Sequence, residues 1–118
     1  KAVIVKTPHT DESHAIHIDS GGKTLVYSAD TGLSLPLAEA AKAVDLFICE
    51  CSFVRNKPVE LHIELAEAIY LSRIAKPKKM LLTHFYPEWD EVDFAEEVAK
   101  FEPLCEVQAA FDGLRLQV

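Results

Sequence analysis

The segment Lys79-Met80-Leu81-Leu82-Thr83-His84-Phe85 decides how the rest of the chain is interpreted. Its apolar run, residues 80–82, predicts a short buried strand, and the run ends at His84 before the turn-forming Tyr86-Pro87-Glu88. A histidine at the end of a buried strand stands at the edge of a sheet, where metal ligands and catalytic bases are often found. His84 is therefore the first candidate functional residue.

The composition describes one small globular domain. The chain has 118 residues, of which 49% are hydrophobic and 26% charged, and its mean hydropathy is +0.07, which is ordinary for a domain with a buried core. No apolar run approaches the roughly 18 residues of a membrane-spanning helix. The formal net charge of -7 opposes binding to phosphate backbones. We therefore expect a soluble protein with no membrane contact and no broad nucleic-acid surface.

The three cysteines, Cys49, Cys51 and Cys105, are too few and odd in number for a disulfide framework. Two of them lie at alternate positions of one predicted strand, so we interpret them as reduced core residues and expect a cytoplasmic protein. The start of the chain shows no signal-peptide pattern. It begins inside a predicted strand, residues 2–5, and from this we expect that part of the complete protein lies upstream.

Strands and helices alternate through the middle of the chain. Apolar runs predict strands over residues 2–5, 15–18, 24–27 and 46–49, with a hairpin turn at Asp19-Ser20-Gly21-Gly22. Helical spacing predicts helices over residues 34–44, 60–75 and 91–101, which begin near Ser34, Glu60 and Asp90. Two last strands are predicted over residues 106–110 and 114–118.

This alternation predicts an α/β fold built from strand and helix layers. The strands are near-continuous apolar runs rather than alternating ones, so both faces of the sheet should be covered. Three helices suffice for one face. We expect the other face to pack against something that this chain does not contain.

Four polar residues follow predicted strands or lie at the start of a helix: His9, Asp30, His62 and His84. Strand ends converge at one edge of a sheet, so imidazoles and a carboxylate there could jointly bind a divalent cation. Each residue also has a plain structural interpretation. Asp30 could simply form a turn with the glycine that follows, His62 could be a helix-entry residue, and His84 a surface histidine.

Other polar residues carry weaker signals. Glu50 ends a predicted strand, where its carboxylate could support a metal ligand from behind or cap a backbone group. His14 and His17 are three residues apart on one strand and so face opposite sides, which excludes a shared site. Phe85 and Trp89 are interpreted as packing residues.

Taken in order, the motifs form a specific set, although each piece alone is common. They are His9-Thr10-Asp11-Glu12-Ser13, Ser28-Ala29-Asp30-Thr31-Gly32, Cys49-Glu50-Cys51-Ser52-Phe53, His62-Ile63-Glu64-Leu65 and Leu82-Thr83-His84-Phe85. This succession resembles the C-terminal half of the metallo-β-lactamase superfamily, most closely its ribonuclease Z-like branch. The resemblance implies a four-layered αββα sandwich of two similar halves. Residues 1–118 would be the C-terminal half, a mixed sheet with helices on one face, and the N-terminal half with its His-x-His-x-Asp-His motif would be absent.

The same resemblance implies a site between the two halves that holds two divalent metal ions, with zinc expected and manganese or iron as alternatives. It implies that His9 is a ligand of one ion, that His84 is a ligand of the other, and that Asp30 bridges both. His62 corresponds to a family histidine that contacts the scissile phosphate and helps to protonate the leaving group. Asp30 and His62 are thus the implied catalytic residues.

Some features depart from the family pattern. His62 is followed by Ile63 and Glu64 where relatives often carry a hydroxyl and a small residue, and His17 stands where they commonly carry arginine. Short bacterial tRNA-processing members have a long insertion between the residues that match His9 and Asp30, whereas here only a tight hairpin joins them. Together with the acidic balance, this favours a phosphodiesterase-like relative acting on a small phosphoester over a tRNA processor.

We therefore expect the complete protein to be a metal-dependent hydrolase in which metal-activated hydroxide attacks a phosphoester or related ester. The isolated chain, with half of the site, should be inactive. The alternative is a half-domain without catalysis that associates with itself or with a partner, because an uncovered apolar sheet face costs about 25 cal/mol per Å². A two-fold pair of chains would bring two sets of His9, Asp30 and His84 together. The expected partner is either the missing half or a second copy.

Overall fold

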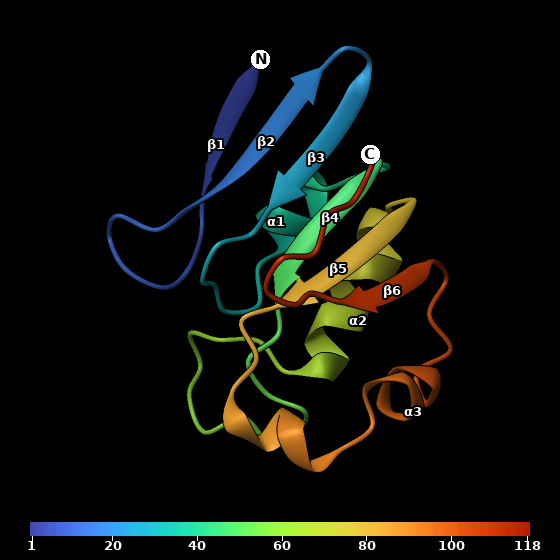
Figure 1. The fold of residues 1–118 in the computed structure, drawn as a ribbon. Helices are drawn as coiled ribbons and strands as arrows, with labels where there is room; N and C mark the ends of the chain where they lie inside the picture. The colour runs from blue at the N-terminus through green and yellow to red at the C-terminus, as the bar shows by residue number, and fades with distance from the viewer.

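The computed structural model describes residues 1–118 and contains one mixed sheet of six strands (Figure 1). The strands lie in the sheet in the order in which they occur in the chain. They are β1 (Ala2–Lys6), β2 (His14–Ser20), β3 (Lys23–Tyr27), β4 (Leu46–Glu50), β5 (Lys79–Thr83) and β6 (Glu106–Ala109). The predicted α/β class with a mixed sheet is confirmed.

The strands change from antiparallel to parallel pairing at β3. β1, β2 and β3 pair antiparallel, and β3, β4, β5 and β6 pair parallel. The two reversals bring β1 back to the direction of β3, so β1, β3, β4, β5 and β6 all end at the same edge of the sheet. A residue placed just after one of these strands therefore lies at that edge.

A two-residue turn closes the hairpin between β2 and β3. Ser20 pairs with Lys23, and the intervening Gly21 and Gly22 have φ angles of 59° and 76°. Two consecutive residues with positive φ match the twist of a tight hairpin, and glycine adopts this conformation without steric cost. The predicted tight hairpin between His9 and Asp30 is confirmed.

Three α-helices follow strands β3, β4 and β5: α1 (Leu35–Ala40), α2 (Leu65–Ala75) and α3 (Phe94–Ala99). The Ser34 hydroxyl caps α1 by accepting a hydrogen bond from the Leu37 N–H at 3.2 Å. At the start of α2 the Glu67 carboxylate accepts from the Glu64 N–H at 3.2 Å. None of the helices combines the length and the hydrophobicity that crossing a membrane requires.

The predicted start of the second helix is wrong by five residues. Residues 57–62 form a loop before α2, and the Lys57 ammonium binds the Glu60 and His62 carbonyl oxygens at 3.3 and 3.0 Å. These contacts satisfy carbonyl groups that a helix would otherwise use. His62 therefore lies in a loop rather than at a helix start.

Two further boundaries differ from the prediction. Residues 91–101 do not form one helix, because a 3-10 helix, η1 (Pro87–Glu91), comes first and α3 begins after Asp93. The Asp93 side chain caps α3 by accepting from the Glu96 N–H at 3.0 Å. Residues 114–118 form no strand.

One face of the sheet carries the core, and α1 and α2 lie behind it in Figure 1. Val26, Phe47 and Met80 are cross-strand neighbours on β3, β4 and β5, and each is 0% exposed. Leu37 of α1 and Leu65 of α2 are buried in the same cluster. This face supplies the continuous apolar layer that stabilises the parallel strands.

Beyond the end of β5, three aromatic side chains extend the core toward α3. Trp89 lies 5.1 Å from Phe85 and 5.5 Å from Phe94, measured between ring centroids. The Trp89 Nε1–H donates to the Cys51 carbonyl oxygen at 2.9 Å. Phe85 and Trp89 are thus packing residues, as the sequence predicted.

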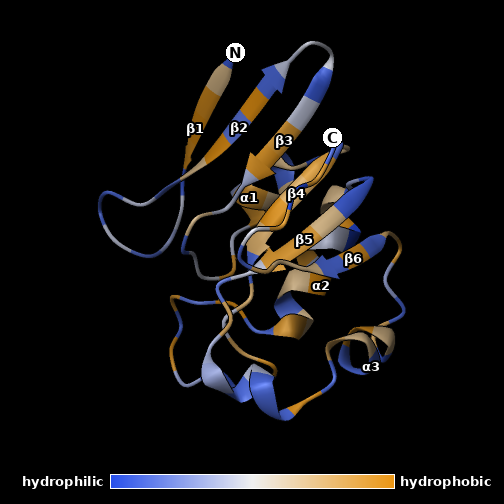
Figure 2. Ribbon diagram, viewed as in Figure 1, coloured by the Kyte–Doolittle hydropathy of each residue, from blue (hydrophilic) through white to orange (hydrophobic).

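The opposite face of the sheet has no helix against it (Figure 1). After β6 the C-terminal segment crosses in front of β5 and β4, and together with those strands it lines a hollow of apolar side chains. In Figure 2, β1 and β4 are coloured largely as hydrophobic, β2 and β3 are mixed, and β6 is largely hydrophilic. We call the part of this face on β1, β2 and β3 the open face; its residues are Ile4, Ile16, Ile18, Leu25 and Tyr27. Ile4, Ile18 and Tyr27 are 66%, 38% and 42% exposed, so the open face leaves a contiguous apolar surface in water.

Asp45 joins the starts of β3, β4 and β5. Its carboxylate accepts from the Lys78 ammonium at 2.7 Å and from the Thr24 N–H at 2.9 Å. These two bonds, that of Lys78 foremost, lower the pKa of Asp45 to about 2. Because this folded-state pKa lies below the unfolded value of about 3.9, the carboxylate stabilises the fold above the unfolded value. That contribution is lost as the pH falls through the folded pKa.

The Asp45→Asn variant is expected to unfold more easily than wild type at about pH 7 because it lacks the charged contact with Lys78. The difference should shrink between about pH 4 and about pH 2, where the wild-type carboxylate becomes protonated. Urea unfolding followed by circular dichroism at several pH values measures this. Glu39→Gln, which neutralises an exposed carboxylate, is the control. A difference between Asp45→Asn and wild type that stays constant over this range would contradict the assignment.

Candidate functional site

Five side chains meet at the sheet edge where β1, β3, β4 and β5 end. His9 follows β1, Asp30 follows β3, Glu50 is the last residue of β4 and His84 directly follows β5. His62 reaches the same place from the loop before α2, with its ring centroid 4.8 Å from that of His9 and 5.4 Å from that of His84. The structure thus brings together all the candidate residues that the sequence singled out.

Asp30 lies between two imidazoles. Its Oδ2 is 3.8 Å from the Nε2 of His9, and its Oδ1 is 3.5 Å from the Nε2 of His84. Both separations are longer than a direct N–H···O hydrogen bond of about 2.9 Å. The side chains of Asp30 and His84 are about two-fifths exposed, which leaves the region between the three groups accessible from solvent.

The other ring nitrogen of each of these histidines is bound within the protein. The His9 Nδ1 is 2.8 Å from the Leu61 carbonyl oxygen, which can only accept, so this nitrogen carries the hydrogen. The His84 Nδ1 is 2.9 Å from the Ser52 Oγ. The Ser52 hydroxyl donates to a carboxylate oxygen of Glu50 at 2.9 Å and therefore accepts from His84. In both neutral rings the lone pair is left on Nε2, facing Asp30.

The Glu50 side chain is only 1% exposed. It accepts hydrogen bonds from the turns and loops that surround it. Its Oε1 accepts from the His62 Nδ1–H at 2.7 Å and from the Thr31 N–H at 3.0 Å. Its Oε2 accepts from the N–H and hydroxyl of Ser52 and from the Ile63 N–H, at 3.2, 2.9 and 3.0 Å. Five donors thus satisfy one carboxylate, which offsets the cost of burying it.

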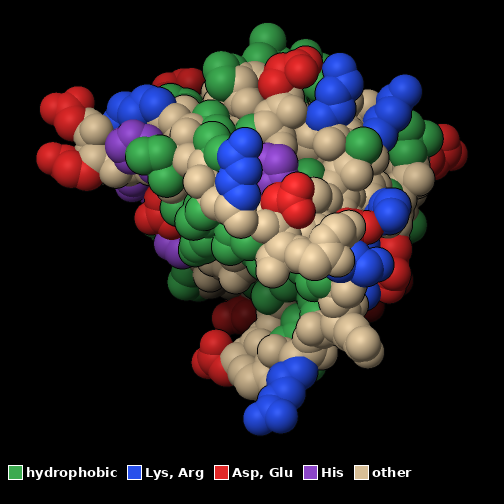
Figure 3. All heavy atoms as spheres, turned by 90° about the horizontal axis from the view of Figure 1, so that it is seen from above, with side chains coloured by type: hydrophobic (Ala, Val, Ile, Leu, Met, Phe, Trp, Pro, Cys, Tyr) green, Lys and Arg blue, Asp and Glu red, His purple; other side chains and the backbone are tan.

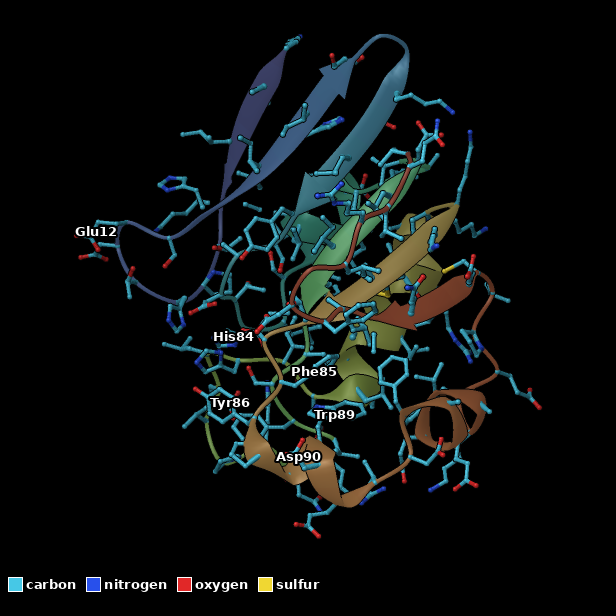
Figure 4. The ribbon with its side chains drawn as sticks, in the orientation of Figure 1. Glu12, His84, Phe85, Tyr86, Trp89 and Asp90 are labelled. Atoms are coloured by element: carbon cyan, nitrogen blue, oxygen red, sulfur yellow. The ribbon has the colours of Figure 1, made fainter.

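His62 has the same tautomer as His9 and His84, with the hydrogen on Nδ1. Because Glu50 accepts the hydrogen on Nδ1, the opposite nitrogen, Nε2, is the one available for chemistry. The ring lies between His9 and His84, and the Tyr86 ring packs 5.6 Å away. In Figure 4, Phe85 and Trp89 lie toward α2, whereas His84 and Tyr86 lie on the other side of the segment that follows β5.

Two groups of residues could be considered as metal ligands. Glu50, His62 and His84 have ligand atoms within 4.8 Å of one another. However, a carboxylate has about four lone-pair sites, and those of Glu50 already accept five hydrogen bonds. Asp30, His9 and His84 instead present unpaired atoms to one another. Glu50 therefore supports the site from behind, and Asp30 is the carboxylate that could bind a metal.

The backbone at the site is constrained. His84 and Ala29 have φ angles of 64° and 51°, a left-handed conformation that costs a residue with a Cβ roughly 1 kcal/mol. At Gly32 an added Cβ would lie 2.6 Å from the Glu60 carbonyl oxygen, so only glycine permits the loop with Leu61 and His62 to lie this close to the Asp30 turn. These features fix the turns that carry the candidate ligands.

The cysteines take no part in the site. Cys49 and Cys51 are 0% exposed on the core side of β4, and burial raises the pKa of both thiols. Cys105, half-buried near α3, is also a free thiol. The expectation that they are reduced core residues agrees with these positions.

Sequence reasoning missed several contributors. The sequence pattern assigns no role to Ser52, although a hydroxyl two residues after Glu50 is placed to reach the same side. The Leu61 carbonyl and the Thr31 N–H carry no side-chain signal at all. Their roles depend on the path of the backbone and could be found only in the structure.

A mixed sheet with helices on one face, and with imidazoles and carboxylates collected where parallel strands end, matches the metallo-β-lactamase fold. The chain belongs to this superfamily, because the family model described as a beta-lactamase superfamily domain matches residues 2–85.

Individual relatives agree with this assignment. The uncharacterized protein Rv1339 of Mycobacterium tuberculosis is 35% identical over 108 residues, which are 89% of this chain and 36% of that protein. A ribonuclease Z of Alkaliphilus oremlandii is 32% identical over 102 residues, 82% of this chain and 32% of that protein. The crystal structure of the metallo-beta-lactamase fold protein YhfI from Bacillus subtilis gives a TM-score of 0.81 at 25% identity, over 96% of this chain and 47% of that one. The chain thus spans less than half of each relative.

Removing the Ser52 hydroxyl should release the ring of His84. In Ser52→Ala the His84 Nδ1–H loses its acceptor, so the ratio of the Nδ1–H to the Nε2–H tautomer is expected to fall about fivefold, as for one lost hydrogen bond. Proton–nitrogen NMR of the imidazoles at about pH 9, well above the ordinary imidazole pKa of about 6.5, measures this ratio.

Ser52→Thr keeps a hydroxyl and is the matched variant, in which the tautomer of His84 should be retained. The His9 ring, which is bound to the Leu61 carbonyl, serves as an internal reference in all samples. An unchanged His84 tautomer in Ser52→Ala would refute this role of Ser52.

Proposed function

We propose that this chain supplies one half of the active site of a metal-dependent hydrolase, with His9, Asp30 and His84 as metal ligands. The observation that supports it best is the arrangement of Asp30: each of its two oxygens faces the free Nε2 of a different imidazole, at 3.8 and 3.5 Å. A carboxylate in this position can bridge two ions, one on the side of His9 and one on the side of His84.

The donor set fits divalent metal ions. Two ligand atoms bound to one tetrahedral ion at about 2.1 Å are about 3.4 Å apart, close to the distances between Asp30 and the two histidines. Neutral imidazole and carboxylate ligands suit zinc, and manganese and iron also accept them. We therefore propose two divalent ions, zinc first, with Glu50 and Ser52 fixing the ligands from behind.

When bound, such ions supply a water acidified to hydroxide near neutral pH and stabilise negative charge on the substrate. The residues of this chain contribute the rest. Asp30 orients the two ligand positions relative to each other. His62, whose Nδ1–H is held by Glu50, has its Nε2 available to contact the substrate phosphate or to give a proton to the leaving oxygen as the bond from phosphorus to that oxygen breaks.

The remaining ligands would come from outside this chain. We propose that residues 1–118 are the C-terminal half of a metallo-β-lactamase-like domain. The N-terminal half would pack on the open face and carry a His-x-His-x-Asp-His motif. The apolar surface of Ile4, Ile18 and Tyr27 supports this, since it needs a cover. On its own, the chain would bind metal weakly and be inactive.

We propose a small phosphoester or related ester as the substrate rather than tRNA. The net charge of -7 disfavours a polyanion. On the face shown in Figure 3, Lys and Arg side chains are interspersed with Asp and Glu instead of gathering into one basic patch. The two-residue turn of the β2–β3 hairpin also leaves no arm between His9 and Asp30. The three free thiols further favour the reducing cytoplasm as its location.

The gene offers the first test: the reading frame upstream of the Lys1 codon is expected to encode the His-x-His-x-Asp-His motif. Its full product, with added zinc or manganese, should hydrolyse bis(p-nitrophenyl) phosphate. Asp30→Ala should lower kcat/KM by about a hundredfold or more, because it removes the bridging carboxylate. The exposed Asp112→Ala is the control.

Two results would contradict parts of this proposal. A product that has the motif and folds but hydrolyses no phosphoester with zinc, manganese or iron would refute the hydrolase. Hydrolysis by the isolated 118-residue chain that Asp30→Ala abolishes would refute the half-site.

A second candidate function is a half-domain without catalysis that binds another copy of itself or a protein partner. The open face supports it, because an apolar surface of this kind on a separate chain favours association. Two copies paired by a two-fold axis would cover both open faces at once.

For the isolated chain we expect a dimer in size-exclusion chromatography with light scattering. Ile4→Ser, which removes the most exposed side chain of the open face, should shift the equilibrium toward monomer. Leu104→Ser, an equally exposed apolar residue outside that face, is the control and should leave the dimer intact. A wild-type chain that stays monomeric at high concentration would rule out self-association.

A further inference from the structure

A pocket of about 700 Å³ opens beside the imidazoles of His9 and His62, and Asp30 is not among its lining residues. It lies between the loop that follows β4 and the segment after β5. Its lining residues are His9, Phe53, Pro58, Val59, Glu60, Leu61, His62 and Tyr86. Apart from His9 and His62, the function proposed above makes no use of the residues that line this pocket.

The lining is largely apolar and contains no lysine or arginine. Val59, Leu61 and Tyr86 are 45%, 44% and 38% exposed, so a ligand in the pocket would remove considerable apolar surface from water. The nearby Lys57 ammonium is already bound to the Glu67 carboxylate at 2.8 Å and to the His62 carbonyl at 3.0 Å. The pocket itself is therefore unsuited to an anionic group.

Aromatic rings define one wall. The Tyr86 ring packs against Phe53 at 4.8 Å with a 59° tilt and against His62 at 5.6 Å with a 52° tilt. Tilted contacts at about 5 Å are the geometry in which aromatic rings attract one another, and the exposed part of Tyr86 is free to make one more. A planar ring fits this wall better than a flexible aliphatic chain.

The opposite wall is held in place before any ligand binds. The His9 ring donates to the Leu61 carbonyl oxygen at 2.8 Å, Lys57 binds the Glu60 carbonyl at 3.3 Å, and Gly32 lies directly against Glu60. Because the loop is fixed, binding costs little additional ordering.

We propose that this pocket is a binding site for a planar, uncharged aromatic ring carried by the substrate. This inference rests on the proposed hydrolase, because His62 is both a wall of the pocket and the residue proposed to give a proton to the leaving oxygen. The ring belongs to the group attached to that oxygen. The substrate class is then a phosphoester with an aromatic-ring substituent next to the scissile bond.

The test uses the isolated chain without metal, so that it does not depend on hydrolysis. Indole is titrated into isotope-labelled protein and followed by proton–nitrogen NMR, with cyclohexanol as a non-aromatic probe. Indole is expected to shift the amide signals of Val59, Leu61 and Tyr86, and cyclohexanol to bind at least about threefold more weakly. In Leu61→Ser, which leaves the backbone carbonyl that His9 uses, indole should bind about fivefold more weakly. Leu104→Ser, exposed elsewhere, should bind indole like wild type.

The outcomes separate the two proposals. Indole shifts outside the pocket, equal binding of both probes, or unchanged binding in Leu61→Ser would each overturn the ring site, whether or not the full protein hydrolyses phosphoesters. Indole binding at the pocket in a protein whose full product shows no hydrolysis would leave the ring site in place and refute only the hydrolase.

Discussion

The buried carboxylate of Glu50 is the constraint on which the rest of the site depends. A carboxylate that is 1% exposed is tolerated only if donors surround it. Here the donors come from three separate segments: the turn after Asp30, the segment at Ser52 that follows β4, and the loop at His62 and Ile63. None of these segments has regular secondary structure. Their positions are set by a shared acceptor, so the order of the site and the stability of the fold at this edge have the same origin.

In each imidazole of the site the two ring nitrogens have different surroundings. The Nδ1 atoms of His9, His62 and His84 all find acceptors inside the chain, in Leu61, Glu50 and Ser52. The Nε2 atoms are therefore left free of these bonds, and those of His9 and His84 face Asp30. A protein with no metal bound would still hold these rings in the tautomer that binds one. The backbone at His84 is left-handed, with a φ of 64°. This unfavourable conformation is consistent with a residue whose side-chain position matters more than its backbone energy.

The sequence predicted the parts of this structure that follow from hydrophobic pattern. Apolar runs placed the strands within one or two residues, and parallel strand ends predicted that His9, Asp30 and His84 would meet. The hydrophobic pattern does not predict the hydrogen bonds made by the loops. Acidic residues at both 60 and 64 suit a helix N-terminus. The structure distinguishes them by the Lys57 contacts with nearby carbonyls and by the hydrogen bond from the Glu64 N–H to the Glu67 carboxylate. Residues 114–118 alternate like a strand, but the chain turns over the sheet face instead of pairing with β6.

The open face and the site are not independent. Tyr27 ends β3 with 42% of its surface exposed on the open face, and Asp30 follows three residues later at the edge. Any structure that covers Tyr27 must come close to the carboxylate of Asp30 and to the Nε2 atoms that face it. The same packing that removes apolar surface from water would therefore also bring new groups to the unpaired side of the site. Burial of the open face and a change in the surroundings of the imidazoles would then be one event.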